Sequence, residues 1–311
     1  MNFELTLLGT GAAMPAYGRF PSAHQLSIRG MDFLLDCGEG AQLQLQRYGR
    51  NPGNLSHLFI THLHGDHCYG LPGLLSTYQL LGRRDPLYVF SPAGLGDMLD
   101  TVLKRSYARL GYPLEVREVV TNRYARIWEN DFLEVYTLPL QHRVPCCGYL
   151  FREKPHLRTL RPGVVEEFDI PYGSIPGIKK GAAFETARGR VIPNEDLTLP
   201  PPPPRSFAYC TDTQYLPGLA PLLRGVDLLY HDATFCEDGR ARARETGHST
   251  AAQAARLARD AGAGRLLLGH FSSRYRDVSL FEQEARPVFE ASIAGREGMQ
   301  VEIPYPGRAM G

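Results

Sequence analysis

Four side chains that can bind a metal ion lie within six consecutive positions, at His62, His64, Asp66 and His67. They directly follow the short apolar stretch 58–60, which we predict to be a buried strand. Buried imidazoles and carboxylates need polar partners, so such a run is not a feature of an apolar core. At a strand end these side chains can fan into a turn. The pattern predicts ligands for two metal ions, His62 and His64 for one, Asp66 and His67 for the other.

One turn cannot complete two metal shells, because a catalytic zinc takes about four ligands and keeps one position open. His142, Asp212 and His270 each follow an apolar segment that we predict to be a strand. Alone, each of them would more often be a surface residue than a ligand. Together with the histidine-rich turn, they fill the gaps in two coordination shells, so we expect them to converge on that turn.

The elements that must position these residues fall into two halves of similar plan. In the first half we predict strands at 4–8, 25–28, 33–35, 58–60, 87–90, 114–120, 125–128 and 133–138, and helices at 41–48, 71–81 and 94–110. In the second half we predict strands at 207–210, 228–231, 265–268 and 299–303, and helices at 250–261 and 280–291. Two halves with metal-type residues at their strand ends favour a sandwich of two sheets with helices outside.

The stretch 151–204 differs from both halves, since it is poor in apolar periodicity and rich in Gly, Pro and Arg. It ends in five prolines, Pro200–Pro204, and such a run favours an extended, semi-rigid polyproline II conformation. The pattern predicts no core within this insert. A long insert of that kind in a compact domain indicates either a functional arm or a disordered loop.

Composition narrows the class of protein further. The chain has 311 residues, 43% of them hydrophobic and 22% charged, which is typical of a soluble globular protein. Its net charge of +1 gives no overall attraction for nucleic acid, so any RNA affinity must come from a local patch. The six cysteines form no CxxC pair and are expected to be reduced. Without a signal peptide or a membrane span, we expect a cytoplasmic protein.

Several motifs resemble those of the ribonuclease Z family, tRNA 3′-processing endonucleases of the metallo-β-lactamase superfamily. The resemblance extends over nearly the whole chain. Its motifs are Leu-Leu-Asp-Cys-Gly-Glu-Gly around Asp36, Thr-His-Leu-His-Gly-Asp-His at 61–67, Gly-Leu-Pro-Gly-Leu at 70–74, Gly-His-Ser-Thr at 247–250 and Leu-Gly-His-Phe-Ser at 268–272. The His-Ser-Thr triplet is the most discriminating of them, because related hydrolases such as glyoxalases and β-lactamases lack it at that place.

The resemblance implies an α/β fold, a four-layer αββα sandwich with a protruding arm, and two zinc ions per subunit. It assigns one ion to His62, His64 and His142, the other to Asp66, His67 and His270, and a bridging position to Asp212. Two ions roughly 3.5–4 Å apart lower the pKa of a water between them and stabilise both the attacking and the leaving oxygen of a phosphodiester. Asp66 is then the expected proton acceptor.

The resemblance also assigns His248 to the scissile phosphate, as the group that protonates the leaving 3′ oxygen. His248 lies just before a predicted helix N-terminus, a place that favours anions, so a phosphate is expected to bind there. The family's His-Glu-Ala-Thr segment orients this histidine, and here it reads His-Asp-Ala-Thr at 231–234. His231 and Asp232 are therefore expected to support the site together with Asp36, although aspartate reaches less far than glutamate.

In the family, an insert between the third ligand and the bridging aspartate clamps the tRNA. Residues 173–181 resemble its glycine- and lysine-containing segment, so Lys179 and Lys180 are expected to bind RNA. Such phosphate contacts position a nucleic acid without reading its sequence. We therefore expect one hydrolase domain over 1–311, with 151–204 as the tRNA-binding arm and its proline-rich return. The expected assembly is a homodimer.

The expected reaction removes the 3′ trailer of precursor tRNA, leaving a 3′ hydroxyl on the tRNA and a 5′ phosphate on the trailer. A first alternative is a small-molecule hydrolase of the same superfamily, such as a cyclic-nucleotide phosphodiesterase, an arylsulfatase or a lactonase. The insert argues against it, because small substrates need no arm. A second alternative is a catalytically silent RNA-binding protein. The complete set of metal-type residues argues against that one.

Overall fold

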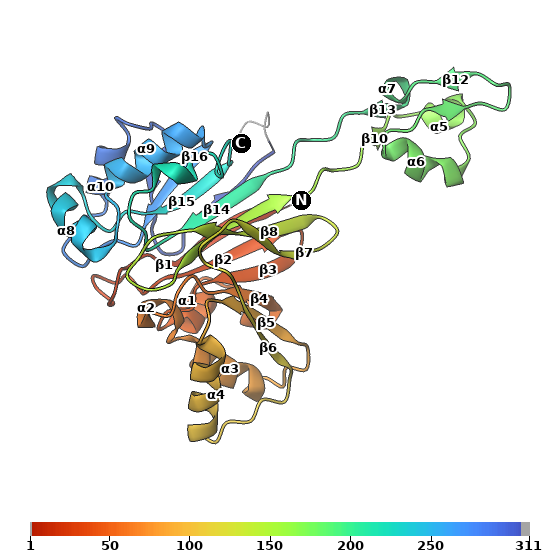
Figure 1. The fold of residues 1–311 in the computed structure, drawn as a ribbon. Coiled ribbons are helices and arrows are strands. Elements are labelled where there is room, and N and C mark those ends of the chain that lie inside the picture. The colour runs from red at the N-terminus through yellow and green to blue at the C-terminus, as the bar shows by residue number, and fades with distance from the viewer. Residues whose placement is uncertain (1, 306–311) are drawn as a thin grey trace. The chain divides into compact units, whose positions relative to one another are not determined.

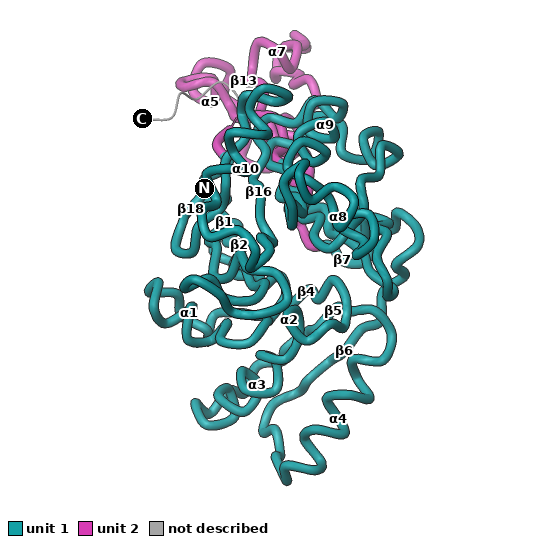
Figure 2. The backbone as a smooth tube through the Cα atoms, turned by 90° about the vertical axis from the view of Figure 1, so that its left-hand side faces the viewer, with its two compact units in different colours: residues 1–129, 134–151, 206–303 teal, residues 130–133, 152–205, 304–311 magenta. Residues whose placement is uncertain are grey.

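The computed structural model describes residues 2–305, which fold into two compact units. The first unit consists of residues 1–129, 134–151 and 206–303, and the second of 130–133, 152–205 and 304–311 (Figure 2). Within the described part of the chain, no helix is long and apolar enough to cross a membrane.

The first unit contains two seven-stranded sheets (Figure 1). The first sheet has the order β18 (Gln300–Glu302), β1 (Phe3–Gly9), β2 (Ala23–Ile28), β3 (Met31–Leu35), β4 (Leu55–Phe59), β5 (Leu87–Ser91), β6 (Leu114–Glu118). The second has the order β17 (Ser292–Ala294), β16 (Arg265–Gly269), β15 (Leu228–Asp232), β14 (Ser206–Cys210), β9 (Cys147–Glu153), β8 (Leu133–Pro139), β7 (Ala125–Glu129). Strands β3 to β6 are parallel to one another, as are β14 to β17, so their carboxyl ends lie at a common edge of each sheet.

Alternation along the strands gives each sheet two apolar faces. In β4, Phe59 contacts Phe151 of the second sheet with ring centroids 5.2 Å apart, whereas the preceding Leu58 packs with the helices on the other side. The helices on that side are α1 (Ala41–Arg47), α2 (Gly65–Cys68), α3 (Leu71–Leu80) and α4 (Leu95–Arg105). On the outer face of the second sheet lie α8 (Arg240–Thr246), α9 (Ala251–Ala261) and α10 (Ser279–Ala285). The predicted αββα layering is confirmed.

Several details of the predicted elements were wrong. The helix expected at 94–110 ends at Arg105, because Tyr107 takes a left-handed backbone conformation with φ of 55°. The helix expected at 280–291 ends at Ala285, since Pro287 lacks the amide needed to continue it. Strand β9 and helix α8 were not predicted at all. β9 reads Cys-Gly-Tyr-Leu-Phe-Arg-Glu and shows no alternation of apolar and polar residues, and the seven residues of α8 carry only a weak periodic signal.

The prediction that the insert has no core was also wrong. Within the second unit, six buried apolar side chains form one cluster: Val164, Ile170, Ile178, Phe184, Ile192 and Leu197. Five of them lie in short elements, namely α5 (Val164–Glu167), α6 (Ile175–Lys179), β11 (Phe184–Glu185), β12 (Val191–Ile192) and α7 (Asn194–Leu197), and Ile170 lies in a loop. The unit also contains the paired strands β10 (Thr159–Leu160) and β13 (Thr198–Leu199). Elements of two to five residues are too short for helical or strand periodicity to show, so the apolar residues seem scattered in the sequence.

A buried ion pair joins the two ends of the insert. Glu153 accepts hydrogen bonds from Arg205 Nε and Nη2 at 3.0 and 2.9 Å, and both side chains are almost fully buried. Burial opposes ionisation of Glu153, but the bonds from Arg205 hold the pKa of its carboxyl below the ordinary value. The charged pair therefore stabilises the fold at neutral pH, and this contribution is lost as the pH falls through that lowered pKa.

Glu153→Gln should lower the free energy of unfolding by about 3 kcal/mol, because it removes the negative charge that pairs with the buried Arg205 guanidinium. Urea titration followed by circular dichroism measures this change. Glu195→Gln, at an exposed position of the same unit, serves as the control and should stay within about 0.5 kcal/mol of wild type. Equal stability of the two variants would show that the pair does not hold the insert.

Candidate metal centre

The ends of four strands bring the predicted ligands together at one edge of the sandwich. The turn after β4 carries the histidine-rich motif, Asp212 follows β14, and His270 follows β16. His142 lies in the loop between β8 and β9. All seven residues predicted from the sequence as metal ligands belong to two groups of closely spaced side chains, described next.

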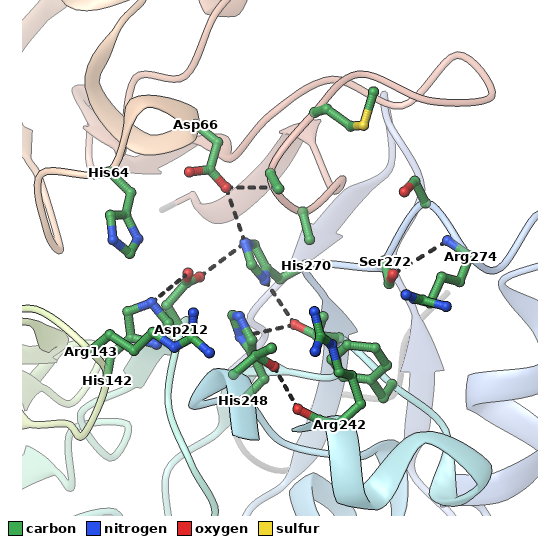
Figure 3. A pocket seen from close by; sticks show the side chains of 17 residues that line it. His64, Asp66, His142, Arg143, Asp212, Arg242, His248, His270, Ser272 and Arg274 are labelled. Atoms are coloured by element: carbon green, nitrogen blue, oxygen red, sulfur yellow. Dashed lines mark hydrogen bonds and ion pairs between the residues drawn. The ribbon is translucent and has the colours of Figure 1, made fainter. Parts of the chain in front are cut away.

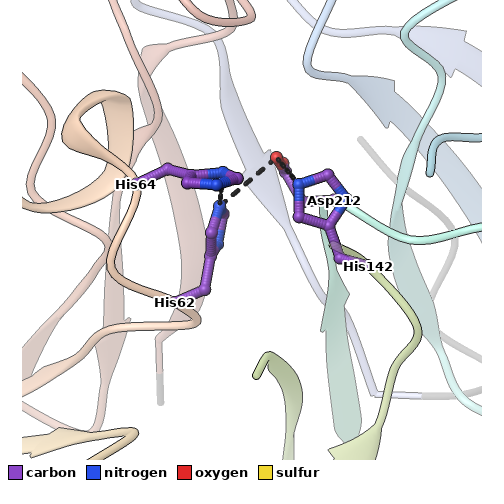
Figure 4. Close-up of side chains that lie close together, drawn as sticks. All are labelled: His62, His64, His142 and Asp212. Carbon is purple, nitrogen blue, oxygen red and sulfur yellow. Dashed lines mark hydrogen bonds and ion pairs between the residues drawn. The ribbon is translucent and has the colours of Figure 1, made fainter. Parts of the chain in front are cut away.

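The first group consists of His62, His64, His142 and Asp212, whose ligand-type atoms all lie within 4.8 Å of one another (Figure 4). His62 Nε2 is 3.0 Å from His64 Nδ1 and 3.5 Å from Asp212 Oδ2. His142 Nε2 lies 3.8 Å from the same carboxylate oxygen. Three imidazoles and one carboxylate oxygen facing a common point form a donor set suited to zinc.

The second group consists of Asp66, His67 and His270, again within 4.8 Å. His67 Nε2 and His270 Nε2 lie 3.2 and 3.0 Å from Oδ1 of Asp212, and both lie 3.5 Å from Oδ2 of Asp66. The carboxylate of Asp212 therefore turns one oxygen to each group. This is the position expected of a bridging ligand between two cations.

The charges of the second group also fit a cation. Both Nε2 atoms, of His67 and of His270, are buried and have no hydrogen-bond partner in the described chain. Burial lowers the pKa of His270, but Asp212 outweighs this and raises it to about 10. Burial likewise opposes ionisation of Asp66, yet His67 and His270 hold the pKa of its carboxyl below the ordinary range. Buried carboxylates thus require positive charge at this point, and a divalent ion supplies it.

Three of the ligand-type histidines are held in place by a hydrogen bond at Nδ1, the ring nitrogen that faces away from the proposed ion. His142 Nδ1 donates to the carbonyl of Gly247 at 2.9 Å, and His67 Nδ1 donates to Asp36 Oδ2 at 2.8 Å. His270 Nδ1 lies 2.9 Å from Oγ1 of Thr234. A partner on the remote nitrogen sets the tautomer and the ring orientation, and so leaves the near nitrogen free for a metal.

Asp36 is the centre of the hydrogen bonds behind the second group. It accepts from the amide and hydroxyl of Thr61 and from the Tyr209 hydroxyl, besides the bond from His67. The backbone is held in an unusual conformation at Asp36, Asp212 and His270, whose φ angles are 54°, 49° and 62°. Left-handed φ values at non-glycine residues are costly, and they cluster at functional sites because the surrounding structure holds them there.

His248 lies beside both groups, with its ring centroid 5.0 Å from that of His142 and 5.3 Å from that of His270. Its Nδ1 donates to Asp232 Oδ2 at 2.8 Å, so the shorter aspartate does reach this histidine. Asp232 also accepts from the amide and hydroxyl of Thr234, which orients the carboxylate. Nε2 of His248 is the nitrogen left to exchange a proton with a substrate.

The expected anion site at the N-terminus of α9 is not formed. Thr250 caps that helix in a capping box with Gln253, and the amide of Ala252 donates to Glu284. The Ala251 amide donates to a backbone carbonyl. The first amides of the helix are therefore all satisfied by the protein, and a phosphate beside His248 has to be bound by side chains instead.

The hollow in front of the two groups measures about 320 Å³ (Figure 3). Arg143, Arg242 and Arg274 line it together with Asp66 and His248. These arginines were not predicted from the sequence, nor were the hydrogen bonds of Thr234 and Tyr209. Three arginines beside clustered histidines suit a phosphate, because one guanidinium group can donate hydrogen bonds to two phosphate oxygens at once.

His231, which was expected to support the site, does not line the hollow. His231 is buried in β15 and donates from Nδ1 to the carbonyl of Asp232, and it belongs to none of the close groups of ligand-type side chains in the described chain. Cys68 directs its thiol to the carbonyls of Leu63 and His64, within the turn itself. Lys179 and Lys180 lie in the second unit, in and just after α6.

Comparison with known proteins places this fold and site in a class. A family model described as Anti-Pycsar protein Apyc1 matches residues 3–132, and one described as Beta-lactamase superfamily domain matches residues 199–271. The solved structure of the metallo-beta-lactamase fold protein YhfI from Bacillus subtilis is similar with a TM-score of 0.68, at 19% identity over 97% of this chain and 100% of that one. The fold and the site define a protein of the metallo-β-lactamase superfamily, whose fold is associated with divalent metal binding.

Closer relatives narrow the class. Proteins named Ribonuclease Z from Porphyromonas gingivalis and Bacteroides fragilis are 45% and 44% identical to this chain, over 97% of it and 99% of their own length. The crystal structure of human tRNase Z, short form, is similar with a TM-score of 0.71 at 28% identity, covering 97% of this chain and 99% of that one. The chain belongs to the ribonuclease Z family.

Proposed function

We propose that this protein is the endoribonuclease that removes the 3′ trailer of precursor tRNA. Membership of the ribonuclease Z family and the likeness to human tRNase Z support this proposal. The observation that carries it is the carboxylate of Asp212, shared between two histidine groups directly beside the His248–Asp232 pair. A reaction in the cell's tRNA pool also favours a cytoplasmic location.

The donor set suits two zinc ions. His62, His64 and His142 would hold one of them, Asp66, His67 and His270 the other, and Asp212 would bridge both. When bound, such a pair supplies a nucleophilic hydroxide at neutral pH and stabilises the charge that develops on the phosphate.

The remaining steps fall to side chains of the chain itself. Asp66 receives an amide hydrogen bond from Ala13 at 2.8 Å, which fixes one carboxylate oxygen while the group accepts the proton of the attacking water. His248, held by Asp232, gives a proton from Nε2 to the leaving 3′ oxygen. The tRNA then ends in a 3′ hydroxyl, and the trailer keeps the phosphate. Arg143, Arg242 and Arg274 bind the phosphates on either side.

The test is cleavage of a 5′-labelled precursor tRNA with a short trailer, in the presence of zinc. We expect a single cut directly after the last nucleotide before the trailer. Hydrolysis of bis(p-nitrophenyl) phosphate without tRNA cleavage would instead favour a small-molecule phosphodiesterase. Binding of the tRNA with neither activity would favour a silent RNA-binding protein.

Asp36 offers a test of the metal centre that does not depend on activity. Asp36→Asn keeps the shape of the side chain but weakens the acceptor of the His67 Nδ1 hydrogen bond. We expect a loss in zinc affinity of about 10–100-fold, measured by competition with a chromogenic chelator. Asp32→Asn, on the strand β3 that precedes Asp36, is the control: its carboxylate accepts from Ser27, and the variant should bind zinc like wild type. Equal affinities would exclude a role for Asp36.

We also propose that the insert binds the tRNA through Lys179 and Lys180, and that the protein acts as a homodimer. Both lysines lie in the part of the second unit that resembles the glycine- and lysine-containing segment of the family's arm. Sedimentation of the purified protein tests the dimer directly.

The double variant Lys179→Ala/Lys180→Ala should raise KM for precursor tRNA by about 10-fold with little change in kcat. Each lost phosphate contact should also reduce the salt dependence of binding by about one in log–log slope. The matched control is Lys104→Ala, on α4, whose ammonium pairs with Asp100. An unchanged KM and salt slope in the double variant would remove these lysines from the binding surface.

A further inference from the structure

A second hollow of about 440 Å³ adjoins the candidate metal centre. His248 lines both hollows, but none of the seven ligand-type residues of the two groups lines the second one. Its other walls include Tyr215, Gln214, Arg240 and Arg244. Whatever occupies this hollow therefore reaches His248 from a side that the metal groups leave open.

The side chains of this hollow match the parts of a nucleotide. Tyr215 is half-buried and packs against the core of the first unit, so its ring is held in place while part of it faces the hollow. Arg244 is exposed and forms no ion pair with any described residue, whereas Arg240 is paired with Glu237. A fixed aromatic ring can stack on a base, and an unpaired guanidinium can bind a phosphate.

The identity of the leaving oxygen decides which nucleotide of the substrate lies in the second hollow. Because Asp232 holds Nδ1 of His248, only Nε2 can protonate a leaving oxygen. The nucleoside that carries this oxygen must then lie directly beside His248. In the proposed reaction the oxygen is the 3′ oxygen of the last nucleotide of the tRNA. The scissile phosphate occupies the hollow of the metal groups, so the space next to it is the second hollow.

We infer that the second hollow binds the nucleotide joined to the scissile phosphate through its 3′ oxygen. Tyr215 stacks on its base, and Arg244 binds the phosphate that precedes it. The inference rests on the proposed function. It predicts that any base is tolerated at this position, since stacking on an aromatic ring is largely independent of sequence.

Two trinucleotides used as competitors test the inference. One carries hydroxyl groups at both ends and mimics the tRNA product. The other carries a 5′ phosphate and a blocked 3′ end and mimics the trailer. Their inhibition constants are measured against bis(p-nitrophenyl) phosphate hydrolysis by wild type, Tyr215→Leu, Arg244→Ala and the control Arg224→Ala, an exposed arginine outside the hollow. Tyr215→Leu keeps an apolar side chain against the core, so the fold is retained.

We expect the inhibition constant of the hydroxyl-ended RNA to rise about 10-fold in Tyr215→Leu and Arg244→Ala, and that of the phosphorylated RNA to stay within about twofold. A rise for the phosphorylated RNA alone, or for neither, would overturn the inference. If wild type fails to cleave precursor tRNA but the expected pattern of inhibition holds, the proposed substrate is wrong while the nucleotide site stands.

Discussion

Asp212→Ala should abolish cleavage of precursor tRNA, with a fall in kcat/KM of at least about 10³-fold. The residue turns one carboxylate oxygen to each histidine group, at 3.5 Å from His62 and 3.0 Å from His270. Its removal takes a ligand from both proposed ions at once, and charge stabilisation by bound metal contributes several kcal/mol to such a reaction.

The measurement combines single-turnover cleavage of labelled precursor tRNA with zinc analysis of the same preparation. We expect the variant to retain less than about half of the wild-type zinc, since it loses a ligand shared by both shells. Asp100→Ala, an exposed carboxylate on α4, is the control and should match wild type in both measurements. Full zinc content together with normal cleavage would disprove the bridging role of Asp212.

His248→Ala should lower the rate of tRNA cleavage by about 10²–10⁴-fold, the usual contribution of a positioned general acid. The loss should be much smaller with bis(p-nitrophenyl) phosphate. A p-nitrophenolate is a stable leaving group and needs no proton, whereas a ribose 3′ oxygen does. His248 also forms a close group with Asp212, Asp232 and His270, but its Nδ1 is bonded to Asp232 rather than directed at the two proposed ions. Zinc content should therefore remain that of wild type.

Asp232→Asn provides the companion variant for His248. With its oxygen at the Oδ1 position, asparagine still accepts the bonds from Thr234. Its amino group at the Oδ2 position cannot accept from Nδ1 of His248 or from the amide of Thr213, so we expect a smaller loss in the same direction. An equal loss on both substrates in His248→Ala would contradict the role of a proton donor. It would indicate instead that His248 only binds the phosphate.

The clustering of the candidate metal ligands was predictable because several ligand-type residues lie close together in a short stretch of sequence. His62 to His67 stand in one turn, and parallel strands then bring Asp212 and His270 to the same edge, as predicted. The residues that orient these groups give no such signal in the sequence. Tyr209 is an ordinary strand residue in sequence, and only the packing of the two sheets brings its hydroxyl to Asp36. Thr234 lies two residues from Asp232, but its contact with His270 depends on the pairing of β15 with β16.

Other failures have the same origin in tertiary packing. One of the amides in the first turn of α9, that of Ala252, donates a hydrogen bond to Glu284, which lies more than thirty residues away in the chain. Whether such an amide is free to bind a phosphate cannot be seen from the local sequence. The core of the insert is assembled from elements of two to five residues, below the length at which periodicity can be detected. Arg143, Arg242 and Arg274 come from three separate loops or helix faces, so nothing in the sequence groups them.

The pairing of β18 with β1 has a consequence during protein synthesis. The register joins Leu5 to Val301, so β1 leaves the ribosome long before its partner strand β18 has been synthesised. At about 5–20 residues per second, this delay is roughly 15–60 s. Throughout that time the nascent chain presents an open β-strand edge, which is a template for intermolecular pairing. A polypeptide that terminates before β18 therefore keeps an unpaired edge strand that is prone to aggregation. We expect it to depend on chaperones or to be degraded.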